Sequence, residues 1–410
     1  MEEQRKQKLG GAVILDKEIS EHLVLGEKNI KIQVDKPFNE LAVDFLVDFS
    51  KELRKFKKVN SFPDLIYLIF WCNKNKNKNL SKYFNGGYLR LGRGLIFHIC
   101  PSNVPTNFIY SFLFGLLSGN SNIVKIPTKD FKEKNIILNT IKSLFNKKKY
   151  LNFKKTNYFI EYSDKNEITK KISSICDGRL IWGGNETVNE IRKTWIPERA
   201  IDLTFPDRYS LSVINLDKLK KEKLDKVKLL AKKFYYDGYM MNQLACNSPH
   251  FVFWTGKINK KLKDFFWNEV SNIVEKKFVF DNIHVVEKYT NLIENIIIQK
   301  DFKKIKMFKN NLYVIDADNK TNDIENIRGI SGTFFQKNID KLADLKSYIT
   351  KKCQTVSYFG FEKKQLKYFL SNNNLMGIDR VVPIGKALEI DIIWDGYETI
   401  KSLSRVISVE

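Results

Sequence analysis

Histidine is scarce in this sequence and cysteine is unpaired, which excludes several classes of site. Among 410 residues there are four histidines, none in an HExxH or comparable spacing, so no metal site is expected. The five cysteines form no CxxC pair and no even framework, which indicates reduced thiols in a cytoplasmic protein.

Long hydrophobic runs are missing as well. The longest apolar run, Phe108 to Leu117, is too short to span a bilayer and predicts a buried helix. The first ten residues are polar and charged, so no signal peptide is expected. We therefore expect a cytoplasmic protein without a transmembrane segment.

Acidic residues are outnumbered: 70 lysines and arginines against 47 aspartates and glutamates give a net charge of +23. Clustered lysines bind nucleic acid or anionic membranes. Here the lysines are spread along the chain among asparagines and isoleucines, and no nucleic-acid-binding motif accompanies them. We expect no nucleic-acid partner, although anionic substrates such as CoA or NADPH would benefit from the positive field.

One segment predicts a parallel strand–helix–strand unit. Gly94 to Ile99 reads as a strand, Thr106 to Leu117 as an apolar helix and Asn122 to Ile126 as a second strand. Short connections of this kind are typical of a parallel sheet covered by helices. Ligands of such sheets bind at the carboxyl ends of the strands, where Asn103 and Lys125 stand.

A second strand end carries glycines. The strand Arg179 to Trp182 runs into Gly183 and Gly184 and then into a helix from Thr187. Glycines at this position let the backbone approach a phosphate at the helix amino end. A simple tight turn explains the same pattern equally well.

Cys246 stands between a helix and the hydrophobic strand Phe251 to Trp254. Its neighbours are polar, a setting that suits a reactive thiol, and they are Asn242, Gln243, Asn247 and Ser248. The alternative is a small core side chain.

The remaining pattern predicts a domain change near Arg208 and one long helix from Leu216 to Phe234. A strand is expected at Phe278 to Asp281, and another at Gln354 to Phe359, which resembles a return to the first sheet.

Five motifs together resemble the LuxC-like acyl-CoA reductases, the fatty acid reductase branch of the aldehyde dehydrogenase superfamily. They are GLIFHICPSNVP, GNSNIVKIP, IWGGNETVNEIR, MNQLACNSPH and GIDRVVPIGKALEIDIIWDGYETIKSLSR. The resemblance covers roughly residues 90–410. It implies an α/β fold of the aldehyde dehydrogenase type: a Rossmann-type cofactor-binding domain, 1–208 completed by 355–410, and an α/β catalytic domain, 209–354.

The resemblance also assigns roles to residues. Cys246 matches the acylated nucleophile, and Asn103 in PSNVP matches the asparagine whose amide stabilises the oxyanion. Lys125 matches the lysine that contacts the cofactor ribose, while Gly183 and Gly184 match the turn near its phosphates.

Departures from the superfamily pattern carry information too. Residues 201–206 lack the glutamate that activates water, which favours reduction over oxidation. Thr128 and then Lys129 stand where a ribose-binding glutamate is common, which favours NADPH, although Lys129 facing only water is an alternative. Gln243 is offset by one position and is assigned no role, and His250 is either a proton-transfer group or a structural histidine.

The expected function is NADPH-dependent reduction of a long-chain fatty acyl-CoA, or of an acyl group delivered by a partner acyl-protein synthetase, to the fatty aldehyde through an acyl-Cys246 thioester. A homo-oligomer is expected. A short-chain CoA-acylating aldehyde dehydrogenase is one alternative, and a basic nucleic-acid-binding protein on a degenerate reductase scaffold is another.

Overall fold

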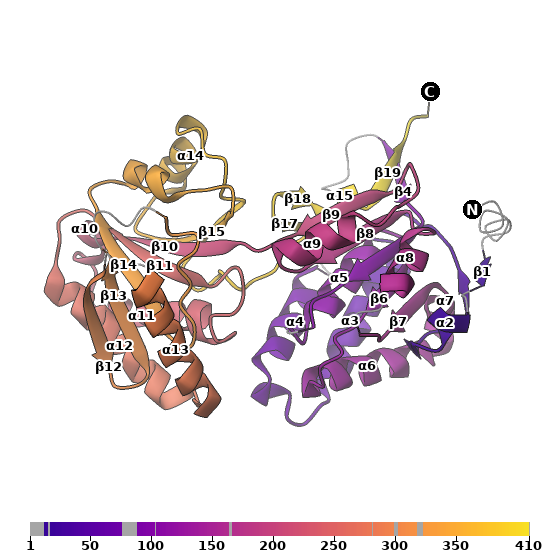
Figure 1. Cartoon of the computed structure of the whole chain (residues 1–410), viewed down its shortest axis with the longest axis horizontal. Helices are drawn as coiled ribbons and strands as arrows, with labels where there is room; N and C mark the ends of the chain where they lie inside the picture. Colours follow the sequence, from indigo (N-terminus) through magenta and orange to yellow (C-terminus); the bar gives the residue numbers. More distant parts are fainter. Residues whose placement is uncertain are drawn as a thin grey trace. The chain divides into compact units, whose positions relative to one another are not determined.

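The computed structural model describes residues 12–14, 17–75, 88–102, 104–163, 166–280, 282–298, 302–317 and 323–409. The chain divides into two compact units. Unit 1 comprises Met1–Pro206 and Ile390–Glu410, and unit 2 comprises Asp207–Glu389. Figure 1 labels the elements of both units.

Unit 1 is built on a six-stranded sheet in the order β2-β7-β6-β5-β8-β9. All neighbouring strands are parallel except β2 and β7. The strands are β2 (Leu23–Leu25), β5 (Leu95–Ile99), β6 (Ser121–Lys125), β7 (Asn157–Ile160), β8 (Gly178–Trp182) and β9 (Ile201–Phe205). The predicted strand–helix–strand unit is therefore confirmed, with helix α5 (Asn107–Leu117) connecting the parallel strands β5 and β6.

Helices cover both faces of this sheet, as the alternating side chains of a parallel strand require. Ile96 packs on one face and its neighbours Leu95 and Phe97 on the other. The first face carries α3 (Glu40–Arg54), α4 (Pro63–Asn75), α5, α6 (Lys132–Phe145) and α7 (Leu151–Thr156). The second face carries α2 (Lys17–Ser20), α8 (Asn166–Ser173) and α9 (Asn185–Arg192).

Short elements complete unit 1. They are the pairs β1 (Ala12–Ile14) with β3 (Asn29–Lys31), β4 (Leu89–Gly92) with β19 (Ser404–Ile407) and β17 (Ile393–Trp394) with β18 (Tyr397–Glu398), helix α15 (Thr399–Ser402), and the 3-10 turns η1 (Val59–Ser61) and η3 (Lys148–Tyr150).

Unit 2 contains a seven-stranded sheet in the order β12-β13-β14-β11-β10-β15-β16. All neighbouring strands are parallel except β12 and β13. The strands are β10 (Tyr209–Asn215), β11 (Pro249–Thr255), β12 (Phe302–Phe308), β13 (Leu312–Ala317), β14 (Thr333–Ile339), β15 (Cys353–Phe359) and β16 (Arg380–Pro383).

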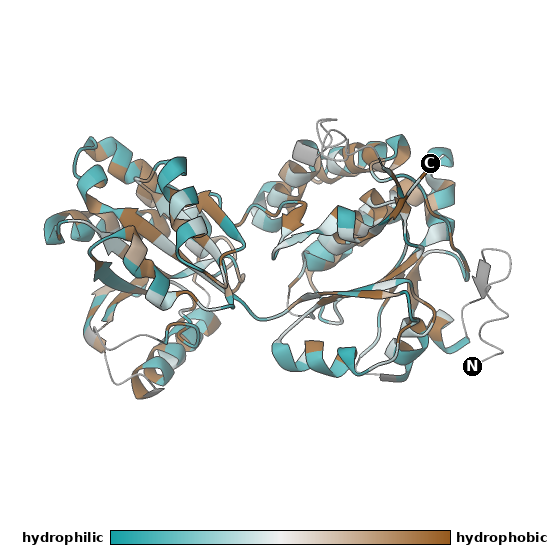
Figure 2. Ribbon diagram, turned by 90° about the horizontal axis from the view of Figure 1, so that it is seen from above, coloured by the Kyte–Doolittle hydropathy of each residue, from teal (hydrophilic) through white to brown (hydrophobic). Residues whose placement is uncertain are grey.

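Helices also cover both faces of the second sheet. One face carries α10 (Leu216–Leu219), α11 (Leu224–Tyr239) and α12 (Lys260–Lys277). The other carries α13 (Asn282–Ile298), the 3-10 helix η4 (Leu342–Tyr348) and α14 (Lys363–Asn372). In Figure 2 the hydrophobic colouring concentrates on the strands and on the helix sides that face them.

The chain returns to unit 1 later than predicted. The strand at 354–359 is β15, which pairs in parallel with β10 of unit 2, and β16 continues the same sheet. Residues 355–389 therefore belong to unit 2 instead of completing the first domain, and the return begins at Ile390. The apolar strand 354–359 suits either buried sheet equally well, so its pattern could not identify the partner.

Two local predictions were wrong. Residues 278–280 form no strand: Phe278 is the C-cap of α12, and α13 begins at Asn282. Asp281, the last residue of the expected strand, lies outside the described residues. The long helix expected from Leu216 is two helices, α10 and α11. The lysine-rich residues 220–223 between them form a turn.

A buried chain of hydrogen bonds crosses the sheet of unit 1. His98 Nε2 lies 2.9 Å from the acceptor Asn122 Oδ1, so this nitrogen carries the proton and Nδ1 accepts from the Ser111 hydroxyl at 2.8 Å. Ser111 Oγ accepts in turn from Trp182 Nε1 at 3.0 Å, and the Asn122 amide donates to Asn157 at 2.7 Å. Burial lowers the pKa of His98 to about 4, so the ring stays neutral.

We expect Gly115→Ala in α5 to destabilise the protein by about 1–3 kcal/mol, because overpacking displaces its neighbours. A Cβ at Gly115 would lie 2.0 Å from Asn122 Oδ1 and 2.8 Å from His98 Nε2. Urea unfolding of the single variant and of the variant in an Asn122→Ala background measures the cost. The cost of the alanine should be smaller once the colliding amide is gone; an equal cost in both backgrounds contradicts the explanation.

Candidate active site

Cys246 lies in the loop between α11 and β11 of unit 2, and its side chain is exposed. The other cysteines, Cys72, Cys100, Cys176 and Cys353, are all buried. The loop is a tight turn, in which the Ser248 N–H donates to the Ala245 carbonyl at 2.8 Å. Ser210 at the start of β10 donates its hydroxyl to the Cys246 carbonyl at 2.6 Å. The backbone of Cys246 is therefore held, while the residue itself is exposed.

Gln243 anchors the approach to this loop, although its spacing suggested no role. The side chain is fully buried and the residue has a left-handed φ of 63°. Its amide nitrogen donates to the Thr333 carbonyl at 2.9 Å and its oxygen accepts from the Gly332 N–H at 3.1 Å. A buried amide satisfied on both sides fixes the backbone that it belongs to.

His250 is a structural histidine. Its ring is buried, and Nδ1 donates to the Gly329 carbonyl at 2.9 Å. Burial, and then the charge of Arg328, lower its pKa to about 3. A ring that stays neutral near pH 7 and has little solvent access is unsuited to proton transfer at the thiol.

The ends of β6 and β8 place the predicted cofactor residues along one edge of the unit 1 sheet. Lys125 is the last residue of β6, is half-buried, and its Nζ lies 4.6 Å from the centre of the Tyr162 ring. Thr128 and Lys129 follow in an exposed turn. Since β6 and β8 both run parallel to β5, their carboxyl ends share this edge.

Gly183 and Gly184 connect β8 to α9, and Gly184 is the N-cap of that helix. Among the described atoms, none lies within 4 Å of a Cβ built on Gly184, and no side chain caps the helix. The first N–H groups of a helix have no intrahelical partner and favour an anion. An open backbone at such a helix end fits the pyrophosphate of a dinucleotide. Asn103, the predicted oxyanion donor, lies outside the described residues.

The region that lacks the superfamily glutamate contains one carboxylate, Asp202 of β9, and that carboxylate is engaged. Its two oxygens accept from Arg179 Nε and Nη2, both at 2.8 Å. The Arg179 side chain is only 1% exposed, so the pair is part of the packing of unit 1. Asp202 is therefore unavailable as a general base.

Two absences concern only the described parts of the chain. No group of three or more histidine, cysteine, aspartate or glutamate side chains there could hold a metal ion. No helix in those parts is long and apolar enough to cross a membrane.

Comparison with protein families identifies residues 81–406 as matching the LuxC acyl-CoA reductase model. The chain belongs to the LuxC acyl-CoA reductase family. No curated protein matches this chain. Membership makes the protein an oxidoreductase of the acyl-CoA reductase type.

Solved structures of aldehyde dehydrogenases share the fold. A lactaldehyde dehydrogenase superimposes with a TM-score of 0.62 at 12% identity, over 91% of this chain and 86% of that one. A salicylaldehyde dehydrogenase from Pseudomonas putida G7 gives 0.61 at 11%, over 91% and 85%. An oxidoreductase from Marinobacter aquaeolei gives 0.64 at 9%, over 95% and 88%. These matches confirm the aldehyde-dehydrogenase-like α/β fold.

We expect iodoacetamide to modify Cys246 of the native LuxC-family protein well before the other cysteines, because only its thiol is exposed among the five. Peptide mass spectrometry after timed exposure measures the order of modification. Protein unfolded in urea is the control, in which all five should react. Native labelling of Cys353 or Cys100 at a similar rate contradicts the arrangement of the site.

Proposed function

We propose that this LuxC-family protein reduces a fatty acyl thioester to the fatty aldehyde, with Cys246 as the acylated nucleophile. The observation that carries the proposal is the contrast between one exposed thiol on a fixed loop and four buried ones. A nucleophile must reach its substrate while its backbone is held, and Cys246 combines both properties.

In the proposed first step, the Cys246 sulfur attacks the thioester carbonyl as a thiolate. A carbon–sulfur bond to Cys246 forms, the bond to the CoA sulfur breaks, and CoA leaves with the proton that the cysteine thiol gave up. The side-chain amide of Asn103 and a backbone N–H near the thiol are the proposed donors to the negatively charged oxygen of the tetrahedral intermediate.

Unit 1 supplies the proposed cofactor-binding residues. Gly183 and Gly184 would lie against the phosphates at the amino end of α9, and Lys125 would contact the ribose. When bound, a nicotinamide cofactor would supply the hydride that reduces the acyl carbon to the aldehyde level. The carbon–sulfur bond to Cys246 then breaks, which releases the aldehyde and restores the Cys246 thiolate. NADPH is the proposed cofactor, because Thr128 and Lys129 leave no carboxylate at these two positions to repel a 2′-phosphate.

The engagement of Asp202 supports reduction over hydrolysis. A general base that activates water would release the acyl group as a fatty acid. Asp202 is the one carboxylate in the region where the superfamily has its water-activating glutamate, and it is paired with buried Arg179. The acyl group on Cys246 is therefore expected to persist until it is reduced.

The acyl donor is proposed to be a long-chain acyl-CoA or an acyl-protein synthetase. The short-chain CoA-acylating alternative uses the same residues, so substrate length decides between the two. Initial rates with acyl-CoA esters of increasing length, followed by loss of NADPH absorbance and by aldehyde formed, make this test. Turnover restricted to short chains favours the alternative.

We expect Cys246→Ala to abolish both acyl labelling and aldehyde formation, and Asn103→Ala to lower kcat on the order of a hundredfold. Incubation with acyl-CoA without cofactor, followed by mass spectrometry, detects the acyl group on the Cys246 peptide. Wild-type protein alkylated to known extents is the control, since its activity should fall in proportion to modified Cys246. Residual turnover in Cys246→Ala contradicts the proposed intermediate.

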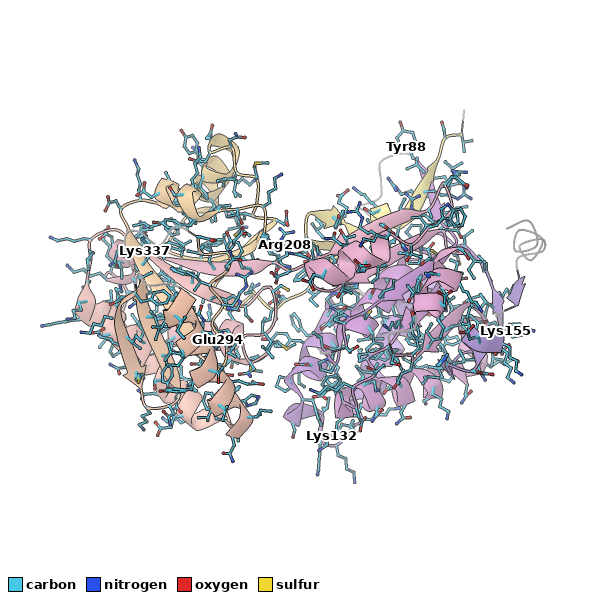
Figure 3. All side chains as sticks on the ribbon, viewed as in Figure 1. Tyr88, Lys132, Lys155, Arg208, Glu294 and Lys337 are labelled. Atoms are coloured by element: carbon cyan, nitrogen blue, oxygen red, sulfur yellow. The ribbon has the colours of Figure 1, made fainter. Side chains whose placement is uncertain are left out.

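We expect Thr128→Glu to lower the preference for NADPH over NADH at least tenfold, because a carboxylate beside the ribose repels the 2′-phosphate and binds free hydroxyls. The measurement is kcat/KM with each cofactor. Lys132→Ala is the control with the same change in net charge: Lys132 is exposed at the start of α6 and extends outward in Figure 3. An equal loss of preference in both variants would indicate a general field effect.

A further inference from the structure

The backbone of Ala387 is a junction of three side chains in unit 2. Its N–H donates to Asp237 Oδ1 at 2.9 Å, and its carbonyl accepts from Arg380 Nη1 at 2.6 Å and from Asn247 Nδ2 at 2.7 Å. Asn247 directly follows Cys246 and is buried. Ala387 belongs to the last of the five motifs, residues 377–405, which we call the tail. It therefore links the loop of Cys246 to the side chains of Asp237 and Arg380.

Asp237 holds this tail segment from the last turn of α11. The residue is 1% exposed, and its second oxygen accepts from the Gly385 N–H at 2.6 Å. Both oxygens thus accept backbone N–H groups two residues apart, an arrangement that suits a carboxylate and that a neutral amide satisfies only in part. The main-chain direction at 385–387 is fixed by these bonds.

The segment can approach α11 this closely because residue 385 is glycine. Gly385 has a left-handed φ of 97°, and a Cβ there would lie 2.8 Å from the Cβ of Lys233, one helical turn before Asp237. On the other side, Arg380 Nη2 donates to the Lys386 carbonyl at 2.9 Å. The tail segment is therefore fixed through both its N–H and its carbonyl groups.

Burying a carboxylate has an energetic cost that a purely packing role would not require. Burial raises the pKa of Asp237 to about 7, even though two N–H bonds and the charge of Arg380 act to lower it. The negative charge of nearby Glu389 also raises the pKa of Asp237. Near pH 7 the carboxyl is therefore only partly ionised, and its two backbone bonds hold the segment that contacts Asn247 beside Cys246.

We infer that Asp237 is a positioning residue for the Cys246 thiol, acting through the backbone at 385–387 and the side chain of Asn247. The inference rests on the proposed role of Cys246. Gln243 and Ser210 hold the loop from the sheet side, and Asn247 holds it from the tail side. Without Asp237, the backbone at 385–387 keeps the Arg380 bonds to its carbonyl groups but loses both bonds to its N–H groups. The Ala387 carbonyl that Asn247 contacts is then held from one side only, and this attachment of the loop weakens.

The test compares Asp237→Asn and Asn247→Ala with a matched control, Gly360→Ala. Gly360 also lies in unit 2 with a φ of 84°, and a Cβ there would lie 2.9 Å from the Cβ atoms of Asn215 and Lys218. The control substitution strains a turn in the same unit without removing any bond of the Asp237–Ala387–Asn247 relay. Thermal unfolding measures the loss of Tm in the control and relay variants, so that variants of similar stability can be compared.

Two readouts separate positioning from general destabilisation. We expect both relay variants to lower kcat at least tenfold while the KM for NADPH stays within twofold, and to increase hydrogen exchange at least threefold in peptides covering 244–250. Gly360→Ala should keep kcat and the exchange of these peptides within twofold at a comparable loss of Tm. If Asp237→Asn fails to fold, Asn247→Ala carries both readouts from the other end of the relay.

Two results would overturn the inference: unchanged exchange at 244–250 in the relay variants, or an equal fall of kcat in Gly360→Ala. Hydrogen exchange does not require the proposed reaction. If the wild-type protein does not reduce acyl-CoA but the relay variants still increase exchange in the loop, the proposed function alone is refuted. If the wild-type protein is active and the relay variants leave the exchange of the loop unchanged, the positioning role alone is refuted.

Discussion

Burial of the parallel strands on both faces is the constraint on which the sites depend. Along β5 and β11 every side chain is buried, so chemistry that needs solvent or a ligand can occur only where strands begin or end. Lys125 and Gly183 stand at carboxyl ends in unit 1, and Cys246 stands just before a strand in unit 2. The burial of the strands therefore restricts the candidate site residues of each unit to the ends of its strands.

The same constraint explains how much could be predicted from sequence. The β5–α5–β6 unit is local, because its strands are adjacent in sequence and paired in space, and its hydrophobic pattern was sufficient. The partner of β15 is set by side chains about 145 positions away, such as Leu211 opposite Val356, and one apolar strand resembles another. The role of Gln243 depends on the Gly332 N–H and the Thr333 carbonyl, 89 and 90 positions away, so no pattern around Cys246 could reveal it.

Lysines and arginines are dispersed along the sequence of this chain. Lys132 and Lys155 of unit 1 are exposed and lie at separate places in Figure 3. Where a cation is buried, it is used internally: Arg179 is held by Asp202, and Lys134 donates to the Pro127 carbonyl at 3.0 Å and pairs with Glu161. Such pairs form part of the packing of each unit, and their partners have little freedom for other chemistry.

The last of the five motifs, residues 377–405, makes contacts in each unit. In unit 2, its residues 385–387 fix the loop of Cys246 through Asp237 and Asn247. In unit 1, Trp394 lies in the core, and the Tyr397 ring packs 5.7 Å from Phe205, which stacks on Trp182 at 3.8 Å, directly before Gly183. A single short segment therefore supports both the thiol loop and the glycine turn, and a substitution within it affects packing at one of them. Spacing within the tail carried no sign of this double role, because Asp237, Asn247 and Phe205, its partners at the two places, lie elsewhere in the chain.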